Sequence, residues 1–260
     1  MENDVYYALE PNISGWVFNE SKSHPSFHIR TNSLGVRDEH IDAENSSIRI
    51  LVVGDSFTFG WGVQEQNRFT ELVERRLDNS TSRGVDVLNA GIPGYGMRDY
   101  YLFLKHRATR YNPDIVVVAF SYDDKLYRKL NDRIWNEVQT KNMSSSLPSK
   151  VRKQIRRYHE KHPIGESNLI PYMRKIWDLH QNRRFRILFY SYWPLPEKAR
   201  KSIFRETNIA KSSILWAPSK FRSNSYKIYT FTPEDHHYNK LGHRWLANKL
   251  TPALTGIILQ

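Results

Sequence analysis

Cysteine is absent from the 260-residue chain. The protein therefore has no disulfide framework, no thiolate nucleophile and no cysteine-ligated metal. Long apolar runs are missing as well, because no segment approaches the roughly 20 consecutive apolar residues that a membrane span needs. The first four residues, MEND, do not begin a secretory signal. We expect a soluble chain whose compartment stays open, and an extracytoplasmic location would fit if a leader has been removed.

Acidic residues are scarce in one part of the chain. The net charge is +12, and residues 125–222 hold 23 of the 39 Lys and Arg but only 7 of the 27 Asp and Glu. A basic field of this size attracts anionic surfaces such as phospholipid headgroups or acidic glycans. A solvated helical face explains the same charges, including the densest patch, Arg152–Arg157. No nucleic-acid-binding motif accompanies them, so specific nucleic acid binding is not expected.

Strand-like and helix-like segments alternate along the chain. Short runs of β-branched and aliphatic residues predict strands at residues 48–53, 85–88, 115–120, 186–190 and 226–229. Apolar residues at helical spacing predict helices at residues 69–77, 97–111 and 239–254. This alternation predicts an α/β fold, a three-layer α/β/α sandwich with a mostly parallel central sheet. With 39% hydrophobic residues, the chain is expected to form one core.

Two segments interrupt the pattern. Residues 1–46 show neither the helical nor the alternating strand period of apolar residues. They are expected to form an irregular arm packed on a domain of residues 47–260. Residues 124–184, polar and basic with helical spacing, are expected to form a helical insertion after the third strand. Because that strand ends at the carboxyl edge of the sheet, the insertion should overhang the site as a lid or recognition element.

Two polar segments carry the chemistry. Hydrolysis of an ester by serine needs an exposed hydroxyl, an imidazole, a carboxylate behind it and donors for the oxyanion. The first core strand ends directly at Gly54-Asp55-Ser56, and near the other end PEDHHYN (233–239) supplies acid and base on one loop. Alone, the first segment is explained equally well as a helix-capping turn. In a parallel sheet, however, both segments would meet at the carboxyl edge.

These segments resemble the SGNH (GDSL) family of serine esterases, from about Ile48 to the end of the chain. The first block of the family is similar to VGDSFTFGWG (53–62), the second to NAGIPGYG (89–96) and the fifth to the loop ending at HYN (237–239). The resemblance implies a flavodoxin-like fold with Ser56 as nucleophile and His237 as base. It also implies that the N–H groups of Ser56 and Gly94 bind the oxyanion, and that no cofactor is required.

One position departs from the family pattern. Asp123 stands where the family has an asparagine whose amide completes the oxyanion hole. An ionised carboxylate would repel the oxyanion, and loss of one such donor costs about 10²- to 10³-fold in rate. Three interpretations stay open. Asp123 is protonated by burial and donates, or the two backbone donors support a slower enzyme, or the site is disabled and the fold serves binding.

Several neighbours of His237 need an assignment. Glu234 and Asp235 both lie within reach of its ring, and Asp235 is favoured because related members often carry the aspartate there. The pair His236-His237 is not expected to bind a metal, since adjacent residues point apart and no third ligand is suitably spaced. Asn239 is expected to cap the last helix and His243 to pack within it. Trp61 and Tyr95, near the first two blocks, suit either substrate contact or core packing.

The sequence thus predicts a serine-dependent hydrolase of carboxylic esters, with an O-acetyl group on a carbohydrate as the expected substrate and an acyl-enzyme intermediate. An O-acyltransferase would use the same triad and differ only in the acceptor of the acyl group. A catalytically disabled carbohydrate- or lipid-binding protein is the alternative that Asp123 favours.

Overall fold

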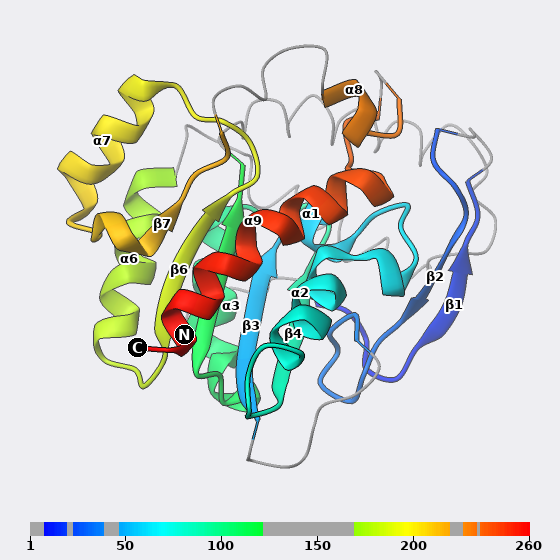
Figure 1. Ribbon diagram of the computed structural model, residues 1–260, viewed down its shortest axis with the longest axis horizontal. Coiled ribbons are helices and arrows are strands. Elements are labelled where there is room, and N and C mark those ends of the chain that lie inside the picture. Colours follow the sequence, from blue (N-terminus) through cyan, green and yellow to red (C-terminus); the bar gives the residue numbers. More distant parts are fainter. Residues whose placement is uncertain (1–7, 20–22, 39–46, 122–168, 219–225, 233–234) are drawn as a thin grey trace, which may run out of the picture.

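The computed structural model describes residues 8–19, 23–38, 47–121, 169–218, 226–232 and 235–260 (Figure 1). The strands are β1 (Ser14–Val17), β2 (Phe27–Arg30), β3 (Ile48–Gly54), β4 (Val85–Gly91), β5 (Ile115–Phe120), β6 (Arg186–Ser191) and β7 (Ile214–Leu215). The α-helices are α1 (Ser56–Phe59), α2 (Phe69–Asp78), α3 (Met97–Tyr111), α6 (Leu169–Gln181), α7 (Glu197–Thr207), α8 (Tyr226–Tyr229) and α9 (Lys240–Ile258). Two 3₁₀ helices are η1 (Glu65–Asn67) and η2 (Lys211–Ser213).

The main sheet has five strands in the order β4-β3-β5-β6-β7, and every neighbouring pair is parallel. The first core strand, β3, lies inside the sheet, and the chain adds β4 on one side and β5 on the other. At such a reversal the loops after the strands diverge and leave room for a site at the carboxyl edge. The predicted α/β class with a parallel sheet is therefore confirmed.

Helices cover both faces of this sheet (Figure 1). Alternate residues of β3 show how the layers form: Leu51 and Val53 belong to the apolar cluster shared with α3, α6 and α7, while Ile50 and Val52 belong to the cluster shared with α2 and α9. All four are almost unexposed. Complete burial of such side chains stabilises the fold by roughly 1.5–3 kcal/mol each, which is why the strand reads as a continuous apolar run.

The prediction of the last strand was wrong. Residues 226–229 form one helical turn, α8, and the fifth strand of the sheet is β7, whose Ile214 pairs with Phe189 of β6. Four residues with apolar and polar positions mixed fit one helical turn as well as a short strand. Beyond this turn the chain pairs elsewhere, because Thr230 forms an antiparallel bridge with Tyr238.

The first part of the chain contains regular structure that its sequence pattern did not predict. Strands β1 and β2 form an antiparallel ribbon, with Ser14 opposite Arg30 and Val17 opposite Phe27. Each strand has only four residues, too few to establish an alternating period. Val17 and Phe27 pack with Phe59 of α1 in a small third cluster, so the ribbon contacts the segment that follows β3.

Most of the expected basic insertion, including Arg152–Arg157, lies outside the described residues. Its described end is α6, an amphipathic helix that buries Leu169, Met173 and Ile176 against the sheet. Among the helices described, none is both long and apolar enough to cross a membrane.

Candidate active site

The turn after β3 positions Ser56. Asp55 caps α1, because its Oδ1 accepts a hydrogen bond from the N–H of Phe57 at 2.8 Å. Ser56 is the first helical residue and is 7% exposed. A side chain at Gly54 would place Cβ 2.0 Å from Oγ1 of Thr58, so only glycine allows the chain to turn this tightly. Gly54 and Asp55 thus shape the turn that positions the hydroxyl of Ser56.

The turn after β4 lies beside it. In the register of the sheet Gly54 is opposite Gly91, and the N–H of Ile92 donates to the carbonyl of Gly54 at 2.9 Å. A Cβ at Gly91 would lie 2.2 Å from the backbone N of Phe59, so α1 packs directly on the end of β4. Three residues on, Gly94 has a φ of +84°, which favours glycine. The loop that carries Gly94 therefore leaves the sheet next to the Ser56 turn.

His237 lies on a loop closed by backbone pairing. The N–H of Phe231 donates to the carbonyl of His237 at 3.2 Å, and the N–H of Asn239 donates to the carbonyl of Tyr229 at 2.8 Å. Asn239 then begins α9, as its Oδ1 accepts from the N–H groups of Leu241 and Gly242 at 2.8 and 3.1 Å. The predicted cap is therefore confirmed. The loop fixes His237 between a short hairpin and a capped helix.

The structure brings Ser56, His237 and Asp235 into one hydrogen-bonded chain. Nε2 of His237 lies 2.7 Å from Oγ of Ser56, and its Nδ1 lies 2.8 Å from Oδ1 of Asp235. The same carboxylate oxygen accepts the backbone N–H of His237 at 3.0 Å. A carboxylate accepts only, so Nδ1 carries the proton and Nε2 is free to accept from the serine hydroxyl.

The electrostatics favour an ionised Asp235. Burial by itself would raise the pKa of this carboxyl, but the hydrogen bond from His237 and the charge of its ring outweigh that effect and lower the pKa below its usual value. A negative charge at Nδ1 stabilises the imidazolium that forms when His237 takes a proton. With His237 only 3% exposed, water screens this interaction weakly.

Aromatic rings surround the imidazole. The ring of Phe57 lies 5.1 Å from that of His237 and the indole of Trp61 lies 6.3 Å from it. The backbone N–H of Trp61 donates to the carbonyl of Ser56 at 3.1 Å, so the indole is tied to the nucleophile turn. Tyr95, the other aromatic residue considered, is 2% exposed and packs in the core.

A buried network of charges supports the far end of α1. The Nη1 of Arg37 donates to the carbonyls of Phe59 and Gly60, both at 2.7 Å, and its Nη2 donates to that of Val63 at 2.9 Å. These carbonyls follow the nucleophile turn, and that of Gly60 also accepts a hydrogen bond from the backbone N–H of Val63 at 3.1 Å. Arg37 therefore connects the arm to the segment that carries Ser56, and it also stacks on the ring of Phe59.

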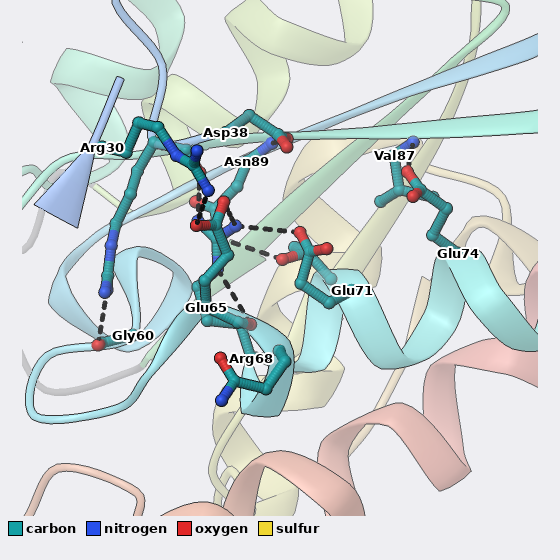
Figure 2. A network of polar contacts seen from close by, with 12 residues as sticks. Arg30, Asp38, Gly60, Glu65, Arg68, Glu71, Glu74, Val87 and Asn89 are labelled. Atoms are coloured by element: carbon teal, nitrogen blue, oxygen red, sulfur yellow. Dashed lines mark hydrogen bonds and ion pairs between the residues drawn. The ribbon is translucent and has the colours of Figure 1, made fainter. Parts of the chain in front are cut away.

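A second arginine, Arg68, donates to the carbonyl of Arg37 and lies among carboxylates (Figure 2). Arg68 is fully buried and pairs with Glu65 at 2.9 Å and Glu71 at 2.8 Å. Asp38, Glu65 and Glu71 hold their oxygens within 4.8 Å of one another, the spacing of a metal site. Here the guanidinium of Arg68 already supplies the positive charge. Burial raises the pKa of Asp38 to about 7, which also lowers its value as a metal ligand.

The other candidate residues are placed differently. His243 packs inside α9, where its Nδ1 accepts from the N–H of Phe69 at 3.1 Å, as expected. Asp123 and Glu234 lie outside the described residues. Sequence reasoning missed His24, which contacts the Trp61 indole from the arm. Its separation of 37 residues from Trp61 follows no periodic pattern, so no sequence signal could have identified it.

Comparison with known proteins gives consistent results. A model of the GDSL-like Lipase/Acylhydrolase family matches residues 52–200, more than half of the chain. No match was found among curated proteins.

Solved structures similar to this chain include three esterases. A two-domain esterase (CEX) active on acetylated mannans is 15% identical, with a TM-score of 0.51 over 82% of this chain and 50% of that one. A variant of the acetyl xylan esterase Axe2 from Geobacillus stearothermophilus is 18% identical, with a TM-score of 0.48 over 80% and 94% of the two chains. The esterase EstA from Pseudoalteromonas sp. is 14% identical, with a TM-score of 0.46 over 82% and 99%.

Proposed function

Because the chain belongs to the GDSL-like lipase/acylhydrolase family, we propose that it is a serine esterase that removes small acyl groups through a covalent acyl-enzyme. One observation carries this proposal: the imidazole of His237 joins the hydroxyl of Ser56, at 2.7 Å, to the carboxylate of Asp235, at 2.8 Å. These distances lie within the range of direct proton transfer. If the Ser56 turn and the Asp235 loop only capped helices, they would not need an imidazole that bonds both of them.

The reaction follows from these contacts. Nε2 of His237 accepts the hydroxyl proton while Oγ of Ser56 attacks the ester carbonyl, and Asp235 stabilises the resulting imidazolium. The same proton is then donated to the leaving alcohol, which leaves the acyl group on Ser56. Water then attacks the acyl-enzyme as His237 takes its proton; the bond between the acyl carbon and Oγ breaks, His237 returns the proton to Ser56, and the carboxylic acid leaves. Asp235 is the acid that we assign to the triad, on the strength of its bond to Nδ1.

The oxyanion is proposed to bind at the two neighbouring turns. The backbone N–H groups of Ser56 and Gly94 are the donors, since the loops that carry them leave adjacent parallel strands, with Gly54 opposite Gly91. Asp123 takes the third position of the family pattern. Substitution of Asp123 by asparagine separates the protonated carboxyl from the other two interpretations: a slower enzyme indicates a protonated carboxyl that donates, and a faster one indicates a slowed or disabled site.

An acetylated carbohydrate is the substrate that we propose. The partly exposed indole of Trp61 lies beside the imidazole, and an aromatic face of this kind suits the apolar face of a sugar. The two-domain esterase CEX, which shares the fold, is active on acetylated mannans. For the present chain, the discriminating measurement is acetate release from acetylated xylan and mannan, compared with hydrolysis of acetyl, butyryl and octanoyl nitrophenyl esters.

The test of the nucleophile uses a pair of matched serines. Ser56→Ala should lower kcat for nitrophenyl acetate by at least about 10³-fold, because the acyl-enzyme forms on this hydroxyl. Ser191→Ala is the control: Ser191 is also buried at the carboxyl edge, but its hydroxyl donates to the carbonyl of Trp193 at 2.6 Å. Equal activity in wild type and Ser56→Ala would overturn the assignment. Adding a sugar acceptor and identifying the acetylated product separates an esterase from an acyltransferase.

A further inference from the structure

A histidine of the arm reaches the wall of the candidate site. His24 lies just before β2, and its ring contacts the indole of Trp61 at 5.9 Å and the ring of Phe231 at 5.9 Å. The packing here is close, since a Cβ at Gly62 would lie 2.9 Å from Cβ of His24 and 2.6 Å from the ring of Phe231. The arm thus closes around the loop that carries Trp61.

The hydrogen bonds of His24 specify one form of its ring. Indole nitrogen only donates, so the contact of 3.0 Å from Nε1 of Trp61 requires an unprotonated Nε2 on His24. The other ring nitrogen, Nδ1, lies 2.9 Å from the carbonyl oxygen of Pro25, which only accepts. Both bonds form together only in the neutral ring with its proton on Nδ1. Protonation of Nε2 would place an N–H donor of His24 opposite the indole N–H of Trp61, and the hydrogen bond between them would be lost.

We propose that His24 is a positioning residue: the neutral ring holds the Trp61 indole beside His237, and protonation of His24 releases the indole and weakens substrate binding. This inference rests on the proposed function, because Trp61 acts there as a wall for the substrate. His24 itself touches neither Ser56 nor the reacting atoms. Its effect is expected on KM, whereas the proton transfers of the triad determine kcat.

The charges around His24 agree with this role. Burial lowers the pKa of His24, the carbonyl of Pro25 and the carboxylate of Asp235 raise it, and the ring of His237 lowers it, with a net decrease. Among the described residues, the rings that pack against it, Phe27, Trp61 and Phe231, carry no charge. His24 is therefore neutral at neutral pH, and the indole is released only on acidification.

The direct test is the pH titration of the Trp61 indole N–H by ¹H–¹⁵N NMR, in protein labelled on tryptophan. Trp61→Phe assigns the cross-peak. In the wild type the peak should move on acidification with a one-proton midpoint below about 6.5, the usual histidine value. In His24→Gln, whose amide oxygen can accept from the indole but cannot titrate, the peak should stay in place. This measurement does not depend on catalysis, so it tests the contact between His24 and Trp61 even if the proposed function is wrong.

The kinetic test compares KM for nitrophenyl acetate at about pH 7.5 and about pH 4.5. Wild type should show an increase of about fivefold, the size of a lost aromatic contact. In His24→Gln the change should fall below about twofold, while the dependence of kcat on pH is retained. His28→Gln is the matched control, because His28 lies on the same ribbon but bonds Oγ of Ser14 at 3.1 Å, and it should behave like wild type.

Two outcomes would overturn the inference. An indole peak that does not titrate in the wild type, or that titrates equally in His24→Gln, would show that His24 does not control Trp61. A change in KM of the same size in wild type and His24→Gln would show that the contact has no effect on substrate binding. Absence of hydrolysis in the wild type would instead count against the proposed function, and the NMR result would still decide the role of His24.

Discussion

Two regions next to each other use the same side-chain types in opposite ways. The site loop holds His237 and Asp235, whereas α9 holds His243 and α2 holds Glu74, which accepts the backbone N–H of Val87 in β4. His237 has a carboxylate at Nδ1 and a hydroxyl at Nε2. His243 instead accepts the backbone N–H of Phe69 at Nδ1 and stacks on the ring of that residue at 5.9 Å. Both rings are buried, so burial alone does not distinguish a reactive histidine from a structural one.

The groups that contact each histidine and carboxylate decide whether its charged form is stabilised. Burial, and then the charges of Arg37 and Arg68, lower the pKa of His243 to about 3, so this ring stays neutral. Burial likewise raises the pKa of Glu74 to about 8, against the effect of its bond from the N–H of Val87, and the acids Glu71, Asp38 and Asp86 raise it further. In the site loop the histidine and the carboxylate stabilise each other's charged forms, which is what proton transfer requires.

The strongest test of this comparison is Asp235→Asn. The amide would favour the wrong tautomer of His237 and remove the charge that stabilises the imidazolium, so kcat should fall by about 10²- to 10⁴-fold with little change in KM. Asp86→Asn is the control, because Asp86 is a buried carboxylate that pairs with Arg49 at 3.0 Å, away from the site. Its kcat should remain near that of wild type. If both variants keep full activity, Asp235 is not the triad acid.

An intermediate effect is expected at His243. Its folded pKa, about 3, lies below the unfolded value of about 6.5. The unfolded state therefore binds more protons between these values, and the free energy of unfolding should fall as the pH decreases from about 6.5 to 3, by up to about 1.4 kcal/mol per pH unit. In His243→Asn, whose Oδ1 can accept from Phe69, this dependence should decrease by one proton. Urea unfolding at several pH values measures this dependence. If the free energy of unfolding changes with pH equally in wild type and His243→Asn, the ring of His243 is not held neutral in the folded state.

The smallest effect is expected at Glu74 and has the opposite sign. Its folded pKa, about 8, exceeds the unfolded value of about 4.3, so the folded state binds the extra proton. The free energy of unfolding should therefore decrease as the pH rises from about 4 to 8, by about 1–2 kcal/mol after allowance for the partial exposure of the side chain. Glu74→Gln keeps an acceptor for the N–H of Val87 and should flatten the curve. An unchanged slope would show that the pKa of Glu74 is not raised in the folded protein.

Much of the fold followed from local patterns. The strands from β3 to β6, the glycines of the Ser56 turn and the cap at Asn239 are all short-range features, in which neighbouring residues satisfy one another's backbone groups. Residues 226–229 show the limit of such patterns, since four residues fit a strand or one helical turn. The ribbon of β1 and β2 was not predictable for the same reason.

The sequence alone determined the order of the strands from β3 to β6, the types of reactive residues and the position of Ser56 at a strand end, because these depend on hydrophobic period and turn chemistry. The tertiary structure alone decided which of those residues meet. Ser56 and His237 are 181 residues apart and bond because β3 ends at the turn that carries Ser56, while the loop before α9, a helix packed on the same sheet, carries His237 to that turn. The contact of His24 with Trp61 and the neutral state of His243 arise in the same way, from packing between segments whose separation in the chain carries no signal.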